Sequence, residues 1–171
     1  MEHLSHGTTS TYPGEWDLSA KTVIFVSKCL CHCKSLCYEE KILADMLIKT
    51  VLVTGANRGL GLEFVRQFLS NPTPPEHLVA TYRDPNTSRD LLELAKTESS
   101  LHAIQLDVTN SKAFPDLVSQ LEKLFGTSGL NLLINNAGYK ESELRDLDSV
   151  TEEQMLKHFR VNCVAPLLLS R

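Results

Sequence analysis

Three glycines in one short turn are the residues of this sequence best placed to bind a phosphate. Gly55, Gly59 and Gly61 lie between an apolar, β-branched run at residues 51–53 and a segment whose apolar residues recur at helical spacing. A strand, a glycine turn and a helix N-terminus together present backbone N–H groups and the positive end of the helix dipole to an anion. The missing Cβ atoms let a pyrophosphate approach the main chain. The sequence therefore predicts a phosphate-binding turn at residues 54–61.

The spacing of the glycines separates the possible ligands. A P-loop would need Lys and then Ser or Thr after the last glycine, where Leu62 and Glu63 stand. The common dinucleotide fingerprint, Gly-x-Gly-x-x-Gly, is also absent here. The pattern Thr-Gly-x-x-x-Gly-x-Gly leaves two readings open, a variant dinucleotide turn and a tight turn that binds nothing, and the residues further along the chain decide between them.

Strands and helices alternate from residue 46 to residue 171. We expect strands at 51–53, 77–83, 101–107 and 130–135, each followed by an amphipathic helix. A capping box at 151–154 should open a last helix that runs to the end of the chain. This alternation predicts an α/β fold, a Rossmann-type doubly wound parallel sheet of about four strands that is incomplete, with ligands at the carboxyl ends of the strands. The fourth strand would keep an open edge and Leu167–Leu169 would be poorly covered, so we expect the isolated chain to aggregate.

Two arginines indicate which dinucleotide would bind. The second predicted strand ends at Arg83, where an NAD-binding protein more often holds an acid for the ribose 2′-hydroxyl. A guanidinium binds a 2′-phosphate instead, through charge-assisted and often bidentate hydrogen bonds. Arg58, inside the glycine turn, is a second cation near that place. Two arginines and no acid predict NADP rather than NAD.

Two further motifs follow the third and fourth predicted strands. The third strand ends Leu-Asp-Val-Thr at residues 106–109, and the fourth ends Asn-Asn-Ala-Gly at residues 135–138. Together with the glycine turn, this order and spacing resembles the cofactor-binding half of a short-chain dehydrogenase/reductase. The sequence Val-Thr-Gly-Ala-Asn-Arg-Gly-Leu-Gly is similar to that of the sniffer-like or C-factor-type carbonyl reductases. The resemblance covers residues 46–171 and implies hydride transfer between NADP and a small carbonyl or alcohol substrate.

The resemblance also implies roles for single residues. Asp107 would hydrogen-bond the adenine, and Ala137 and Gly138 would pass close to the cofactor. From the residues alone, Asp107 could equally cap a helix, and Asn135 and Asn136 could form a polar turn. The residues that we expect at the cofactor are Thr54, Gly55, Asn57, Arg58, Gly59, Leu60, Gly61, Arg83, Asp107, Val108, Asn136, Ala137 and Gly138.

Asn162 is the one candidate catalytic residue. Its place after the fourth strand resembles that of the Asn in the family's Asn, Ser, Tyr and Lys site. Pro166 lies four residues on and has no N–H, so the carbonyl of Asn162 loses its helical partner and the helix should kink. In the family that carbonyl holds a water in the proton relay. The alternative reading is that Pro166 only bends a packed helix.

The rest of the family's active site is missing from these 171 residues. The family polarises a carbonyl with Ser and protonates its oxygen with the Tyr of a Tyr-x-x-x-Lys pair. None of Tyr12, Tyr38, Tyr82 and Tyr139 has Lys four residues on. We therefore expect the chain to be the cofactor-binding half of an oxidoreductase and to be inactive by itself.

Residues 1–45 differ from the rest of the sequence. They read as an extension that is disordered or not native, and residues 22–26 could form a short strand with nothing obvious to pair with. Four cysteines fall at positions 29, 31, 33 and 37, a spacing that does not match the Cys-x2-Cys pairs of zinc modules. We expect no metal site there.

Composition excludes several partners. The net charge of −4 and pI near 5.9 argue against nucleic acid, and no apolar run approaches the length of a membrane span. The first residues lack the features of a signal peptide, so we expect a cytoplasmic protein. For the full-length protein we expect a homo-oligomer.

Two other functions compete with a carbonyl reductase. One is a non-catalytic dinucleotide-binding or interaction module in which the short chain is a real product. The other, a Rossmann-like methyltransferase, more often has an acid where Arg83 stands.

Overall fold

The protein is built on a five-stranded parallel sheet. The computed structural model describes residues 24–27, 48–140 and 147–171. The strands lie in the order β1-β5-β2-β3-β4. Their bounds are β1 Ile24–Ser27, β2 Thr50–Val53, β3 His77–Tyr82, β4 Leu101–Gln105 and β5 Leu132–Asn135. The helices are α2 Gly59–Leu69, α3 Arg89–Thr97, α4 Phe114–Phe125, α5 Glu152–Phe159 and α6 Ala165–Leu169, with a π-helical turn, Arg160–Val164, between the last two.

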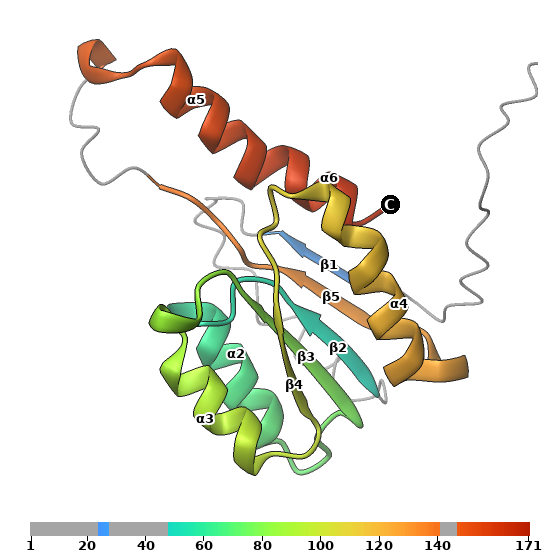
Figure 1. Cartoon of the computed structure of the whole chain (residues 1–171). Coiled ribbons are helices and arrows are strands. Elements are labelled where there is room, and N and C mark those ends of the chain that lie inside the picture. Colours follow the sequence, from blue (N-terminus) through green and yellow to red (C-terminus); the bar gives the residue numbers. More distant parts are fainter. Residues whose placement is uncertain (1–23, 28–47, 141–146) are drawn as a thin grey trace, which may run out of the picture.

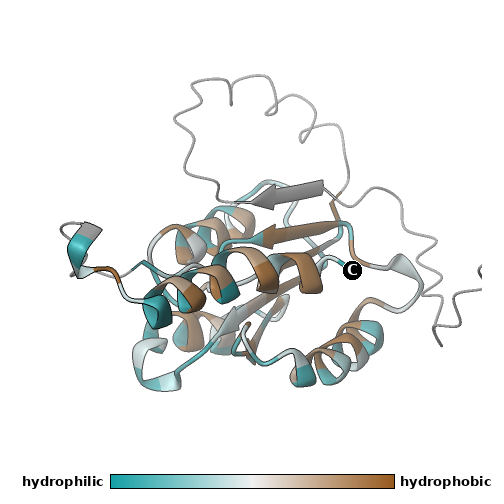
Figure 2. Cartoon of the chain, turned by 90° about the horizontal axis from the view of Figure 1, so that it is seen from above, coloured by the Kyte–Doolittle hydropathy of each residue, from teal (hydrophilic) through white to brown (hydrophobic). Residues whose placement is uncertain are grey.

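Helices cover both faces of the sheet. Helices α2 and α3 lie on one face, and α4 and α6 lie on the other (Figure 1). One core cluster joins Leu62, Val65 and Leu91 of α2 and α3 to the sheet, and a second joins Leu117 and Leu121 of α4 to the opposite face. Alternate residues of β2, β3, β4 and β5 therefore enter opposite cores, which is why β2 reads as a continuous apolar run. Figure 2 shows the apolar residues concentrated on the sheet and on the helix faces turned to it.

The predicted Rossmann-type sheet is confirmed over its four expected strands, as is the last helix. Thr151 accepts a hydrogen bond from the backbone N–H of Gln154, and the Gln154 side chain accepts one from the N–H of Thr151, so the predicted capping box is present. Gly126 ends α4 with a φ of 53°. Leu167 is 71% exposed, as expected for a poorly covered helix face.

One sequence-based expectation about the sheet is wrong. The segment at 22–26 was expected to have no pairing partner, yet β1 runs parallel to β5, with Ile24 opposite Leu132 and Ser27 opposite Asn135. The outer edge of β5, expected to be open, is therefore occupied. Parallel neighbours can come from distant parts of a chain, so local sequence patterns do not reveal them.

Two histidines meet between β3 and β4. Nδ1 of His77 lies 3.3 Å from Nε2 of His102, and the His77 ring also lies against Phe125. Burial lowers the pKa of His102 below its ordinary value of 6.5, and the neighbouring His77 lowers the pKa further. The folded protein thus holds His102 neutral at a pH where the unfolded chain binds a proton.

This difference predicts that the stability of the folded protein decreases as the pH is lowered. The free energy of unfolding should decrease as the pH drops through 6.5, the ordinary pKa of His102, and level off below its folded pKa. Replacing His102→Gln removes the titration and keeps a hydrogen-bonding side chain. Urea unfolding at about pH 7.5 and about pH 5 should therefore show a smaller loss of stability for the variant than for the wild type. Equal losses in the two proteins would contradict this account.

Candidate cofactor site

The carboxyl end of β5 is fastened to the glycine turn through Thr54. The Thr54 side chain is buried, and its Oγ1 accepts hydrogen bonds from the backbone N–H groups of Asn136 and Ala137, each at 3.0 Å. The same hydroxyl donates to the carbonyl of Ile134 at 3.3 Å. Thr54, expected at the cofactor, therefore points into the protein and positions the turn.

Asn136 completes this joint from the other side. Its Nδ2 donates to the carbonyls of Thr54 and Gly55, both at 2.9 Å. A Cβ on Gly61 would collide with that nitrogen and with the carbonyl of Gly55. Gly61 is therefore required so that α2 can pack against the joint. Asn136, like Thr54, acts on the cofactor site by holding the turn in place.

Glycine is needed at the other two positions of the turn for different reasons. Gly55 has a φ of +63°, and a Cβ there would lie 2.7 Å from the Cα of Ala137. Gly59 has a φ of +57° but nothing within 4 Å of its missing Cβ. Gly59 is thus the glycine that faces open space, as a turn that receives a ligand against its backbone requires.

The N-terminus of α2 is available to an anion. Arg58 is the N-cap residue and makes no side-chain hydrogen bond to the first turn, in contrast to the capping box of α5. The first N–H groups of a helix have no carbonyl partner within it, and they lie at the positive end of the dipole. Leu60, in this first turn, is 56% exposed.

A hollow of about 480 Å³ opens beside the glycine turn. Asn57, Arg58 and Gly59 line it from the turn, and Arg89 lines it from the start of α3. Within the described residues, Arg58 and Arg89 have no carboxylate partner, whereas Arg66 pairs with Asp90 at 3.4 Å. The hollow is therefore lined by two guanidinium groups that no carboxylate of the described residues pairs with.

The structure brings some predicted residues to this hollow and leaves others outside it. Asn57 donates from Nδ2 to the carbonyl of Thr87 at 3.3 Å and so ties the glycine turn to the loop before α3. Arg83 is exposed and does not line the hollow. Sequence reasoning did not single out Arg89. Its position in the first turn of a helix that follows Arg83 was the available signal.

Asp107 and Val108 follow β4 at the same end of the sheet. Oδ1 of Asp107 accepts from the N–H and the hydroxyl of Thr109, at 2.9 and 2.7 Å. Asp107 therefore stabilises a turn, and no partner for its other oxygen, Oδ2, is found in the part of the chain that the structure describes. Val108 is half-buried against the core cluster of α4.

Asn162 lies within the π-helical turn and contacts the chain just after Gly138. Its Oδ1 accepts from the N–H of Tyr139 and its Nδ2 donates to the carbonyl of Tyr139, both at 2.8 Å. The N–H of Ala165 bonds the carbonyl of Arg160, so the helix widens just before Pro166. The helix thus departs from α-helical bonding around Asn162, in the form of a π-turn.

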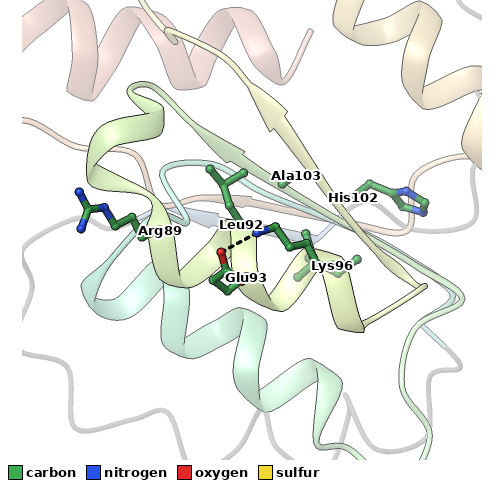
Figure 3. A pocket seen from close by; sticks show the side chains of 8 residues that line it. Arg89, Leu92, Glu93, Lys96, His102 and Ala103 are labelled. Atoms are coloured by element: carbon green, nitrogen blue, oxygen red, sulfur yellow. Dashed lines mark hydrogen bonds and ion pairs between the residues drawn. The ribbon is translucent and has the colours of Figure 1, made fainter.

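A second hollow, of about 590 Å³, lies between α3 and the first residues of β4, away from the carboxyl ends of the strands. Figure 3 shows Lys96 paired with Glu93 along α3 and His102 on the strand side. Arg89 borders both hollows, but this one is lined only by residues of α3 and β4 and by none of the glycine turn, so we do not assign it a role in cofactor binding.

The described residues contain neither a metal-binding cluster nor a membrane-spanning helix. Within 24–27, 48–140 and 147–171, no group of three or more His, Cys, Asp or Glu side chains could hold a metal ion. The same ranges contain no helix long and apolar enough to cross a membrane. The cysteines at 29–37 lie outside the described residues.

The chain belongs to the short chain dehydrogenase family, whose model matches residues 49–171. It is 36% identical over 125 residues to the short chain dehydrogenase virK of Hypocrea virens, covering 67% of this chain and 44% of the relative. It is 38% identical over 125 residues to norsolorinic acid ketoreductase stcE of Emericella nidulans, covering 71% and 46%. The chain thus spans about half the length of the curated relatives that it matches.

Solved structures of carbonyl reductases share this fold. The NADPH-bound carbonyl reductase from chicken fatty liver is 40% identical, with a TM-score of 0.68 over 72% of this chain and 49% of that one. Carbonyl reductase Sniffer of D. melanogaster is 36% identical, with a TM-score of 0.69 over 72% and 49%. These comparisons confirm the predicted family, including its sniffer-like neighbours.

Thr54 provides a test of the joint between β5 and the glycine turn. Replacing Thr54→Val keeps the shape, leaves the N–H of Ala137 without its acceptor and takes from the N–H of Asn136 one of its two acceptors, the other being the carbonyl of Ile134. We expect a loss of about 1–3 kcal/mol in the free energy of unfolding. Thr97→Val is the matched control, since the Thr97 hydroxyl makes one exposed bond, to the carbonyl of Leu94, and should cost less than about 0.5 kcal/mol. Urea unfolding measures both, and equal losses would contradict the role given to Thr54.

Proposed function

We propose that this chain is the cofactor-binding half of an NADP-dependent oxidoreductase that reduces a small carbonyl compound by hydride transfer. The observation that carries the proposal is the glycine turn, where the uncapped start of α2 and the open backbone at Gly59 adjoin a hollow lined by two arginines that pair with no carboxylate in the described part of the chain. Bound NADPH would supply the hydride. The protein would supply the diphosphate site, the grip on the ribose phosphate and the orientation of the nicotinamide.

The pyrophosphate would lie against the first turn of α2. The N–H groups of residues 59–61 stand at the positive end of the helix dipole, and Gly59 leaves room for close approach. Gly55, Thr54 and Asn136 hold this backbone in position from inside the protein. A diphosphate is thus stabilised chiefly by main-chain groups, which explains why the site requires few charged side chains.

The 2′-phosphate would be bound by arginine. Arg58 and Arg89 line the hollow beside the turn. Arg83, the residue that follows β3, is exposed and precedes Arg89 by a short loop. A guanidinium with no carboxylate partner retains its full attraction for an incoming dianion. We assign Arg58 and Arg83 to this phosphate, as the sequence predicts, and add Arg89 on the evidence of the hollow.

The remaining assignments concern the adenine and nicotinamide ends of the cofactor. Asp107, through its second carboxylate oxygen, and Val108 would contact the adenine, and Ala137 and Gly138 would pass close to the cofactor, having little side chain. Asn162 would place its main-chain carbonyl at the proton relay, because Pro166 cannot donate to it and its side chain is held by Tyr139.

The catalytic partners of Asn162 are absent from these 171 residues, as no Tyr-x-x-x-Lys occurs in them. We therefore propose that the chain binds NADPH without reducing a carbonyl by itself. For the full-length protein we propose a cytoplasmic homo-oligomer.

Gly59 tests the phosphate site. Replacing Gly59→Val puts a β-branched side chain at a φ of +57° and fills the open space at the turn, so the dissociation constant for NADPH should rise at least about tenfold. Gly129→Val is the control, because Gly129 has a φ of +60° and equally open surroundings but lies before β5, far along the chain from the turn. Calorimetric titration with NADPH should show weaker binding for the first variant alone. Wild-type affinity in Gly59→Val would remove the phosphate-site assignment.

The arginines test the choice of cofactor. Replacing Arg83→Asp should reverse the preference for NADPH over NADH, because an acid repels the 2′-phosphate and accepts a hydrogen bond from a 2′-hydroxyl. Arg89→Ala should weaken NADPH binding roughly tenfold and leave NADH binding unchanged. Lys123→Ala, in the last turn of α4, is the control for loss of one positive charge. If the ratio of the two affinities stays constant in both arginine variants, the NADP assignment fails.

A further inference from the structure

The hollow beside the glycine turn has one wall on α2 and the other on the start of α3. Arg58, Leu62 and Arg66 recur every four residues and line it along one side of α2. Arg89 and Asp90 line it from the first turn of α3. The two helices lie side by side on the same face of the sheet (Figure 1). The hollow therefore extends from the glycine turn to an ion pair that joins the two helices, the pair of Arg66 and Asp90.

The charges around this hollow are not evenly matched. Its described lining contains three guanidinium groups, those of Arg58, Arg66 and Arg89, and one carboxylate, that of Asp90. Nη2 of Arg66 lies 3.4 Å from Oδ2 of Asp90, and Nη1 of Arg66 lies 3.9 Å from Oε2 of Glu63, another residue of α2. In the part of the chain that the structure describes, Arg66 is thus the arginine of this lining that an acid on the opposite wall holds.

Asp90 occupies a position that favours an anion. It lies in the first turn of α3, and Ser88, the N-cap residue, makes no side-chain hydrogen bond to that turn. The first N–H groups of a helix have no partner within it, and the helix dipole stabilises a carboxylate beside them. The start of α2 also lacks a side-chain cap. The positive ends of two helices therefore border the hollow, and Asp90 is an anion that the chain itself supplies to them.

A phosphate in the hollow would use the groups that now bind Asp90. A phosphate monoester carries almost two negative charges and three acceptor oxygens, so it attracts a guanidinium more strongly than one carboxylate does. The side chains of Arg66 and Asp90 are 47% and 69% exposed, and an ion pair so open to water contributes little to stability. Arg66 can therefore exchange Asp90 for a phosphate. The carboxylate that remains beside the phosphate repels it.

We propose that Asp90 is an internal competitor of the 2′-phosphate, and that Arg66 is the guanidinium for which the two compete. In the empty site Asp90 holds Arg66. When NADPH binds, Arg66 joins the other arginines assigned to the phosphate. Asp90 therefore limits how strongly the chain prefers NADPH over NADH. This inference rests on the proposed function and concerns the 2′-phosphate alone, a group that NADH lacks.

Replacing Asp90→Asn tests the competitor. The amide keeps the shape, removes the negative charge and frees Arg66. The dissociation constant for NADPH should therefore fall at least about threefold, whereas that for NADH should stay within about twofold. Asp116→Asn is the matched control, because Asp116 lies in the first turn of α4 and does not line the hollow, and it should change neither constant. Calorimetric titration measures all of these constants. An unchanged NADPH constant in Asp90→Asn would overturn the proposal.

Replacing Arg66→Gln tests the shared guanidinium. The change removes one cation and leaves Asp90 unpaired beside the phosphate, so the dissociation constant for NADPH should rise at least about threefold and that for NADH should not. Lys123→Gln is the control, since Lys123 lies in the last turn of α4 as Arg66 lies in the last turn of α2. Raising NaCl from about 0.05 M to about 0.5 M should reduce the differences between the variants, because salt screens exposed charges. Wild-type NADPH affinity in Arg66→Gln at low salt would show that Arg66 does not reach the phosphate, and the proposal would be wrong.

The competition and the proposed function fail in different ways. If the wild-type chain binds neither NADPH nor NADH, the proposed function is wrong and the competition is wrong with it. If the wild type binds NADPH and Arg89→Ala weakens that binding, but Asp90→Asn does not tighten it, the proposed function stands and the role given to Asp90 is wrong. Equal gains for NADPH and NADH in Asp90→Asn would also contradict that role, because the effect would not come from the 2′-phosphate.

Discussion

The structure of the candidate site depends on one joint, where the carboxyl end of β5 is bonded to the turn that leaves β2. A single buried hydroxyl, that of Thr54, accepts two backbone N–H groups from beyond β5 and donates to the carbonyl of Ile134. Asn136 returns two bonds to the carbonyls of the turn. These contacts join residues 80 or more positions apart and set the orientation of the first turn of α2. The phosphate site is therefore a product of tertiary contacts as much as of the glycine motif.

The three glycines of the motif answer to different constraints. Gly55 and Gly61 are required by packing, because a Cβ at either would strike the backbone or side chains of this joint. Gly59 alone is required by its backbone conformation in open surroundings. A glycine pattern thus reports both how tightly a turn packs and where a ligand could approach. Only the structure distinguishes these two reasons, since in the sequence all three are simply Gly.

Much of the fold could be predicted from the sequence, because parallel buried strands, amphipathic helices and caps leave local patterns. Examples are the apolar run that forms β2, the glycine at 126 that ends α4 and the capping box that begins at Thr151. What could not be predicted arises from distant residues. Arg89 reaches the hollow only because α3 starts beside the glycine turn, and β1 finds its partner more than a hundred residues later. The inward direction of Thr54 was missed for the same reason, because its partners come from the end of β5.

β5 connects the two unusual features of the molecule. Its inner side meets β2 and its last residues form the joint with the glycine turn, while its outer side is covered by β1. The segment after it, at Tyr139, is held by the side chain of Asn162 from the π-turn. A shift of β5 would therefore move the backbone that accepts from Thr54 and the loop that Asn162 fixes.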